Sequence, residues 1–106
     1  MTERLDKLAA ELGQRLQAAQ LMLATAESCT GGWVSKVVTD IPGSSSWFDR
    51  GFVTYTNGAK QDMLGVSAVK LDEHGAASEE VALQMANGVL EHSLAGVAVA
   101  VTGLAG

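Results

Sequence analysis

Three short apolar runs, each followed by a turn of small and polar residues, constrain the fold of this chain most strongly. The runs cover residues 21–26, 51–56 and 96–101. Each has the length of a strand, and the last is apolar throughout, as expected of a strand that helices cover on both faces of a sheet. Segments with helical spacing separate the runs. The sequence therefore predicts an α/β fold, with three layers (αβα) around a mainly parallel central sheet.

The helices are predicted from apolar spacing and from residues that start or stop a helix. Leucines at 5, 8, 12 and 16 would share one helix face. Pro42 ends a second apolar stripe, since proline lacks an amide donor, and Ser78 is a good N-cap. Asn57-Gly58 is also a hairpin signal, but the segment after it favours a helix. The predicted helices cover residues 2–20, 33–38, 59–65 and 78–92, with a polar loop over residues 72–75.

Composition excludes several classes of protein. With 47% hydrophobic residues in regular periods, the chain has enough apolar surface for a core, which argues against a disordered protein. Lys and Arg number 7 against 12 Asp and Glu, for a net charge of -5 and without a basic run. A protein that binds the nucleic-acid backbone needs such basic groups. We expect no nucleic-acid partner, whereas a small anionic ligand held by a few groups stays possible.

The expected location is the cytoplasm, with no membrane partner. Cys29 is the single cysteine, so neither a disulfide framework nor a multi-cysteine zinc site can form. The N-terminus lacks the apolar core of a signal peptide. The longest apolar stretch, residues 94–101, is far shorter than the roughly 20 residues that span a bilayer.

Polar segments follow all three predicted strands, at the rim of the sheet where α/β folds bind ligands. Residues 27–32 follow the first strand, residues 55–57 with Lys60 follow the second, and Thr102-Gly103 follow the last. Exposed amides at the start of a helix suit a phosphate or an oxyanion. We therefore expect a substrate site there, with these candidate binding residues: Thr30, Gly31, Gly32, Asn57, Thr102 and Gly103.

Ser28 is the candidate nucleophile of this site. A hydroxyl on a sharp strand-to-helix turn can point outward, but it needs a base. Lys60 is the candidate base, because a lysine in apolar surroundings can lose its proton near neutrality, and Tyr55 could donate or relay a proton. Two simpler interpretations stay open: Ser28 or Thr30 as a plain helix cap, and Lys60 as a solvated side chain.

Other reactive side chains are weaker candidates. His74 and His92 fit surface roles, in a polar loop and at a helix end. Cys29 could act as a thiol nucleophile, but it is expected to be a small core residue that points away from Ser28. Trp33 lies in a helix stripe and is expected in the core. We expect no metal, because acidic residues and histidines do not gather in more than isolated groups.

Five ordered motifs resemble the CinA C-terminal domain family, which includes the stand-alone nicotinamide mononucleotide deamidases. The match runs from about residue 5 to the last residue. In this sequence the motifs are Ala26-Glu27-Ser28-Cys29-Thr30-Gly31-Gly32, Pro42-Gly43-Ser44-Ser45-Ser46-Trp47-Phe48, Gly51-Phe52-Val53-Thr54-Tyr55-Thr56-Asn57 with Ala59-Lys60, Gly75-Ala76-Ala77-Ser78-Glu79, and Val101-Thr102-Gly103-Leu104-Ala105-Gly106. Five motifs in order are far more specific than a lone glycine pattern.

The resemblance implies an amidohydrolase that converts nicotinamide mononucleotide into nicotinic acid mononucleotide and ammonia, without a cofactor or a metal. It places Ser28 at the family's proposed nucleophile, Lys60 at its base and Tyr55 at a supporting group, with Thr102 and Gly103 lining the site. The small-molecule nucleotide is the expected substrate, in pyridine-nucleotide recycling. The expected assembly is a homodimer, and residues 1–106 are expected to form a single, incomplete amidohydrolase domain.

Two departures from the family pattern bear on activity. Gly58 stands where relatives usually have a glutamate, which is expected to loosen the turn that positions Lys60. After Gly-x-Ala-Gly the family continues with further strands, a last helix and an arginine implicated at the site. The alternatives to an active enzyme are therefore a nucleotide-binding or interaction module without turnover, or a remnant that does not fold alone.

Overall fold

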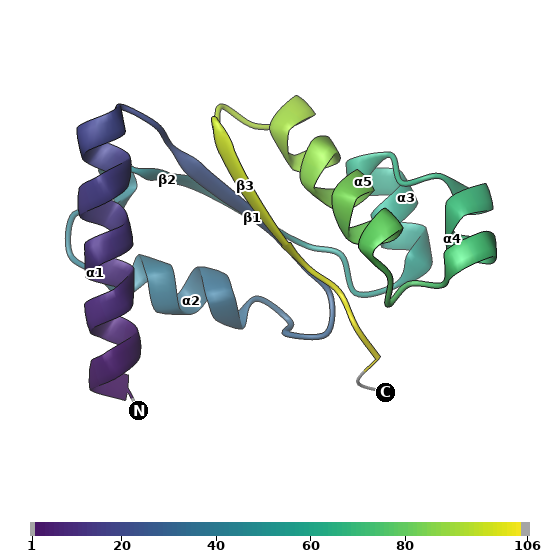
Figure 1. Cartoon of the computed structure of the whole chain (residues 1–106), viewed down its shortest axis with the longest axis horizontal. Coiled ribbons are helices and arrows are strands. Elements are labelled where there is room, and N and C mark those ends of the chain that lie inside the picture. Colours follow the sequence, from purple (N-terminus) through teal and green to yellow (C-terminus); the bar gives the residue numbers. More distant parts are fainter. Residues whose placement is uncertain (1, 105–106) are drawn as a thin grey trace.

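The computed structural model describes residues 2–104 and contains one parallel sheet between two helical layers. Strand β1 (Leu23–Glu27) lies between β2 (Phe48–Val53) and β3 (Val97–Val101), in the order β2-β1-β3. Helices α1 (Thr2–Ala19) and α2 (Trp33–Thr39) cover one face; α3 (Asn57–Leu64), α4 (Ala68–His74) and α5 (Glu79–Glu91) lie on the other (Figure 1). The predicted three-layer αβα fold is confirmed. Ala105 and Gly106, which end the fifth motif, lie outside the described residues.

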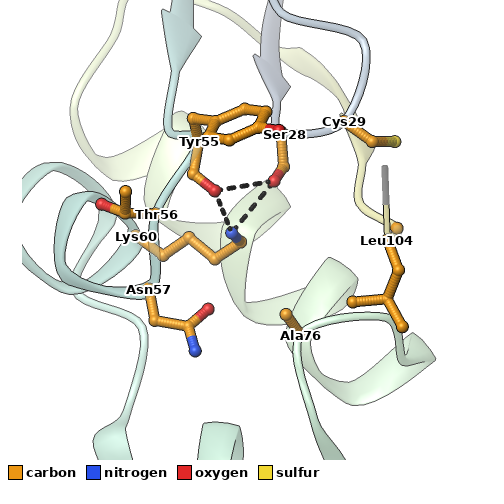
Figure 2. Close-up of a pocket in the computed structure, with 9 residues that line it drawn as sticks. Ser28, Cys29, Tyr55, Thr56, Asn57, Lys60, Ala76 and Leu104 are labelled. Atoms are coloured by element: carbon orange, nitrogen blue, oxygen red, sulfur yellow. Dashed lines mark hydrogen bonds between the residues drawn. The ribbon is translucent and has the colours of Figure 1, made fainter. Parts of the chain in front are cut away.

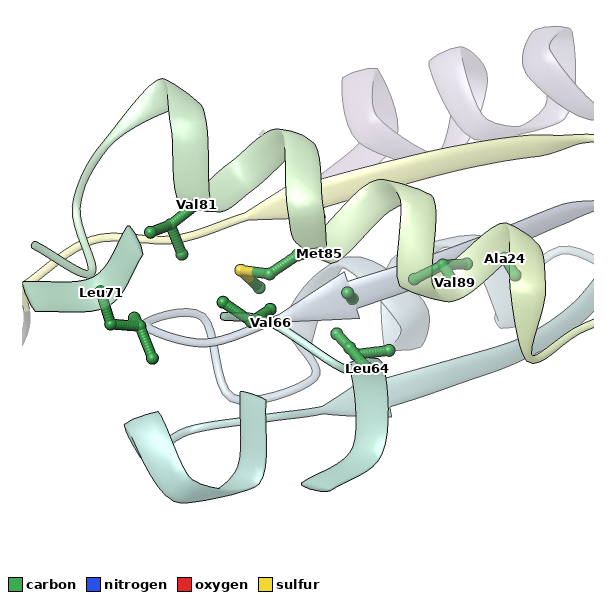
Figure 3. Close-up of a cluster of buried hydrophobic side chains, with 8 residues drawn as sticks. Ala24, Leu64, Val66, Leu71, Val81, Met85 and Val89 are labelled. Atoms are coloured by element: carbon green, nitrogen blue, oxygen red, sulfur yellow. The ribbon is translucent and has the colours of Figure 1, made fainter. Parts of the chain in front are cut away.

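Strand β1 is the centre of the molecule, and all five of its residues are buried. Successive side chains of a strand point to opposite faces, so β1 contributes to two cores. Leu23 packs with residues of α1 and α2 on one face. Ala24 packs on the other face, beneath α3 and α5 (Figure 3). Ala26 belongs to the same cluster. The larger core consists of Ala24, Ala26, Leu64, Val66, Leu71, Val81, Met85 and Val89.

Side-chain caps explain where the three helices of the second face begin. Thr56 Oγ1 accepts a hydrogen bond from the Ala59 amide at the start of α3, at 3.0 Å. Ser67 caps α4 and Ser78 caps α5 in the same way. Such a cap satisfies one amide that lacks a partner within the helix. The helix predicted from Ser78 is therefore confirmed in its position and its cap.

The second strand begins earlier than predicted. It covers Phe48–Val53, not residues 51–56. The Leu23 amide donates to the Trp47 carbonyl at 2.8 Å, and the last ladder bond runs from the Thr54 amide to Glu27 O. Strand propensity continues through residues 54–56, but these residues already turn toward α3. The charged pair Asp49-Arg50 made the true start resemble a loop, although an edge strand tolerates charge.

β3 lies at an edge of the described sheet, beside β1, and is partly buried. Two further expectations were wrong. Residues 72–75 were expected in a loop, but a short helix, α4, ends at His74 and buries one leucine, Leu71. Trp33 is 53% exposed at the start of α2, whereas Trp47 is buried.

No helix within residues 2–104 has the length and apolar character to cross a membrane.

Candidate active site

Ser28 follows β1 directly and is placed by the alternation of that strand. Ala24 and Ala26 face the core beneath α3 and α5, so the side chain two residues further on faces the same way. The Ser28 amide donates to the Val101 carbonyl at 3.0 Å, which extends the β1–β3 pairing by one residue. The side chain is 3% exposed. Its hydroxyl is thereby directed toward α3.

Lys60 approaches Ser28 from α3 and is 1% exposed. Its Nζ donates to Ser28 Oγ at 3.0 Å and to the Tyr55 carbonyl at 3.2 Å. Ser28 Oγ donates to the same carbonyl at 3.2 Å. Figure 2 shows the resulting triangle of one hydroxyl, one amine and one backbone oxygen. The structure thus brings together the two side chains that the sequence nominated as nucleophile and base.

The surroundings of Lys60 favour its neutral form. Both hydrogen-bond partners of Nζ within the described residues are uncharged. Burial lowers the pKa of Lys60, and the electrostatic effect of Cys29 opposes this change. A buried amine without a carboxylate partner gives up its proton more easily than a solvated lysine. The neutral amine can accept a proton from Ser28.

Tyr55 contributes its backbone rather than its phenol to this triangle. The side chain is 55% exposed and lines the pocket beside Ser28, while the carbonyl is held between Ser28 and Lys60. Within residues 2–104 the phenol makes no hydrogen bond, so its expected part in proton transfer stays a prediction. The carbonyl could not be foreseen, because sequence patterns do not reveal which backbone atoms a side chain meets.

A pocket of about 280 Å³ opens at this triangle. Asn57 and Gly103 line it, as expected of substrate-binding candidates. A Cβ on Gly103 would lie 3.1 Å from Cys29 Sγ, so a larger residue there would crowd the wall. The full lining is Ser28, Cys29, Tyr55, Thr56, Asn57, Lys60, Ala76, Gly103 and Leu104.

Cys29 differs from the expected core residue. It is half-buried and forms part of the pocket wall. Its side chain points away from Ser28 Oγ, as predicted (Figure 2).

The other candidate binding residues do not line the pocket. Thr30 Oγ1 donates to a carboxylate oxygen of Glu27 at 2.7 Å, and the Gly31 amide donates to the Ser28 carbonyl at 3.1 Å. Gly32 caps α2 with φ 105°, a left-handed conformation that favours glycine. Thr102 Oγ1 donates to the Ala76 carbonyl at 2.7 Å and so holds the loop before α5 against β3.

The turn after Ser28 nevertheless offers free amides. Within the described residues, the amides of Cys29 and Thr30 donate no hydrogen bond, whereas the Gly31 amide is occupied. Unpaired amides directly after a nucleophile can stabilise an oxyanion. The amides that this turn can offer to an oxyanion are therefore those of Cys29 and Thr30.

Gly58 does not prevent the placement of Lys60. It lies in the first turn of α3, where Thr56 caps the helix. The expected loosening of this turn stays a prediction, although α3 forms with Gly58 in its first turn. His74 and His92 lie away from the pocket lining, at the ends of α4 and α5, and His92 Nδ1 is 2.8 Å from the Gly88 carbonyl. Across residues 2–104, no three His, Cys, Asp or Glu residues gather as a metal site would require.

Sequence reasoning missed the contacts of Glu27 with the turn that follows Ser28. Its carboxylate is 1% exposed and accepts hydrogen bonds from residues of the following turn and of α2. The available signal was an acidic residue at the end of an otherwise apolar strand, because a buried carboxylate requires compensating donors.

Comparisons with known proteins agree with the five motifs. A family model described as CinA C-terminal domain matches residues 5–106. Nicotinamide-nucleotide amidohydrolase PncC from Escherichia coli strain K12 is 54% identical over 102 residues, which are 96% of this chain and 62% of that protein. The same name is carried by a protein of Enterobacter agglomerans, 54% identical over 98% of this chain and 63% of its own length.

Solved structures show the same fold. The competence/damage inducible protein CihA from Agrobacterium tumefaciens superposes with a TM-score of 0.92 at 53% identity, over 96% of this chain and 62% of that one. The competence damage-inducible protein A from Klebsiella pneumoniae superposes with a TM-score of 0.93 at 37% identity, over 96% and 63%. The chain therefore spans less than two thirds of the length of these relatives.

Proposed function

Because the chain belongs to the CinA C-terminal domain family, we propose that it is an amidohydrolase that cleaves the carboxamide of nicotinamide mononucleotide. The products are nicotinic acid mononucleotide and ammonia. The name of the relative from Escherichia coli supports this substrate. The observation that carries the proposal is the buried contact of 3.0 Å between Lys60 Nζ and Ser28 Oγ, beside a pocket open to a ligand.

The reaction uses Ser28 as nucleophile and Lys60 as base and acid. Neutral Lys60 Nζ takes the Ser28 proton while Oγ attacks the carboxamide carbon. The amides of Cys29 and Thr30 face the developing oxyanion. Lys60 then returns the proton to the amide nitrogen, which leaves as ammonia. Water attacks the resulting ester with Lys60 again as base, and this step releases the acid and restores Ser28.

Tyr55 and the rim residues complete the proposed site. The Tyr55 carbonyl accepts a hydrogen bond from Nζ and holds the amine toward Ser28. The Tyr55 ring and Asn57 contact the substrate, since both line the pocket. Gly103 forms part of the pocket wall, and Thr102 holds Ala76 of that wall in place. Thr30, Gly31 and Gly32 form the turn that carries the oxyanion amides. The protein works in the cytoplasm as a homodimer and acts on a small-molecule nucleotide. It needs no cofactor and has no nucleic-acid or membrane partner. Residues 1–106 form one amidohydrolase domain.

The first test is ammonia release from nicotinamide mononucleotide by the chain and its variants. We expect Ser28→Ala to lower the rate by roughly a thousandfold or more, because no other group replaces the nucleophile. Lys60→Met should have a similar effect. Ser45→Ala, an exposed serine in the 3-10 turn at Ser44–Ser46, is the matched control and should keep full activity.

Two results would count against this proposal. Full activity of Ser28→Ala would remove Ser28 as nucleophile. Saturable binding of the mononucleotide without any ammonia from the unaltered chain would identify a nucleotide-binding module instead. Calorimetric titration alongside the rate assay separates these two outcomes.

A further inference from the structure

The buried carboxylate of Glu27 accepts four hydrogen bonds, all from the segment that follows Ser28. Oε1 accepts from Thr30 Oγ1 at 2.7 Å and from the Val34 amide at 2.8 Å. Oε2 accepts from the Ser35 amide at 2.9 Å and from Ser35 Oγ at 2.8 Å. One side chain thus connects the end of β1, the turn and the first turn of α2.

The arrangement favours an ionised carboxylate. Each oxygen faces one backbone N–H, from Val34 on one side and from Ser35 on the other. The NH2 group of a glutamine cannot accept a hydrogen bond, so it would point at one of these donors. Burial alone raises the pKa of a carboxyl group, but the hydrogen bonds from Ser35, Thr30 and Val34 outweigh it and lower the pKa of Glu27.

Helix α2 depends on this carboxylate for its cap. The N-cap residue, Gly32, has no side chain that could accept a hydrogen bond from the first amides. Val34 and Ser35 are the second and third residues of α2, the positions whose amides an N-cap side chain normally satisfies. Glu27 therefore supplies from the strand the acceptor that the N-cap lacks.

The carboxylate also holds the turn that follows Ser28. The turn is held at Thr30 by the carboxylate and at Gly31 by the Ser28 carbonyl. Ser28 itself is held by the bond of its amide to the Val101 carbonyl, and Lys60 is held by α3 and by the Tyr55 carbonyl. A shift of the turn would therefore move the free amides of Cys29 and Thr30 relative to Ser28 Oγ and Lys60 Nζ, instead of moving the whole site together.

We propose that Glu27 is the positioning residue of this site: its carboxylate holds the turn after β1 so that Ser28 and the amides of Cys29 and Thr30 face the substrate carbon together. The proposal rests on the proposed function for its catalytic consequence. A displacement of about 1 Å at a reacting group can cost a hundredfold in rate. Glu27 itself lies on the opposite face of β1 from Ser28, so it does not touch the substrate.

The test compares Glu27→Gln with Glu11→Gln, which removes an exposed carboxylate on α1. Amide hydrogen exchange, read by mass spectrometry, reports the turn and α2 without any substrate. We expect at least tenfold faster exchange in residues 28–35 of Glu27→Gln, with unchanged protection in α5. Steady-state rates should show kcat lowered at least tenfold, with KM within about twofold. Glu11→Gln should match the unaltered chain in both measurements.

The two readouts separate this inference from the proposed function. If Glu27→Gln exchanges faster but the unaltered chain releases no ammonia at all, the proposed function is wrong and the anchoring of the turn still stands. An active Glu27→Gln variant with unchanged kcat would overturn the positioning role and keep the function.

If Glu27→Gln does not fold, Thr30→Val decides instead, because it removes one of the four donors and keeps the Thr30 amide. A lower kcat with unchanged KM supports the inference. A raised KM with unchanged kcat would make Thr30 a substrate contact and overturn it.

Discussion

Lys60 shows how a single residue can be made reactive by its position. A lysine side chain normally keeps its ammonium group in water. In this chain α3 directs it into the protein, where a serine hydroxyl and a backbone carbonyl are its hydrogen-bond partners. Neither partner compensates for the lost hydration of a positive charge, which explains the lowered pKa of this amine. The same feature that suits a base also costs the folded state stability.

This cost predicts how stability changes with pH. In the unfolded chain Lys60 loses its proton near the ordinary value of 10.5, and in the folded protein at a lower pH. Between the two values the unfolded state binds more protons, so the free energy of unfolding rises as pH rises through that window. Urea unfolding at a series of pH values should show this rise. Lys60→Met should lack it, whereas Lys36→Met, at an exposed lysine, should keep it.

All chains in this experiment carry Cys29→Ser, because the electrostatic effect of Cys29 raises the pKa of Lys60. An equal rise with pH in Lys60→Met and in its parent would show that other groups cause it.

At the scale of elements, the sequence predicted types and order well and boundaries less well. The pairing of Ser28 with Lys60 could be anticipated, because parallel strands bring their carboxyl ends to one rim of the sheet. The start of β2 at Phe48 could not, since a charged pair interrupts its strand pattern. α4 escaped detection because a short helix that buries only Leu71 leaves almost no periodic signal. Contacts of Thr30 and Thr102 with loop and turn atoms depend on tertiary geometry, which residue patterns do not encode.

The close packing of α5 on α3 yields a prediction about two glycines. A Cβ on Gly88 would collide with the Leu64 carbonyl and lie 2.8 Å from Leu64 Cβ. Gly88→Ala should therefore push α5 away from α3 and lower the free energy of unfolding by roughly 2 kcal/mol. Gly58→Ala is the control, because its nearest atom would be Thr56 Oγ1 at 3.8 Å. It should raise stability by about 0.5 kcal/mol through helix propensity.

Urea unfolding of both glycine variants measures these changes. If Gly88→Ala proved as stable as the unaltered chain, α5 would not be held tightly against Leu64.

At the scale of the whole molecule, the two faces of the sheet are covered but its β3 edge is open in the described residues. β3 pairs with β1 along one side. Its other side presents backbone donors and acceptors, and Val99 is 40% exposed in the middle of the strand. Leu94 and Leu104, which flank the strand, are also largely exposed. An apolar edge of this kind favours pairing with another chain.

We therefore expect the chain to self-associate through β3, and sedimentation velocity over a range of concentrations should detect it. Val99→Lys places a charge in the middle of the edge strand and should shift the population toward monomers. Met63→Lys is the matched control, because Met63 is also 40% exposed but lies on α3, away from β3. Equal effects of both substitutions would mean that added charge alone disperses the chains. Monomers of the unaltered chain at every concentration would mean that the open edge does not drive association.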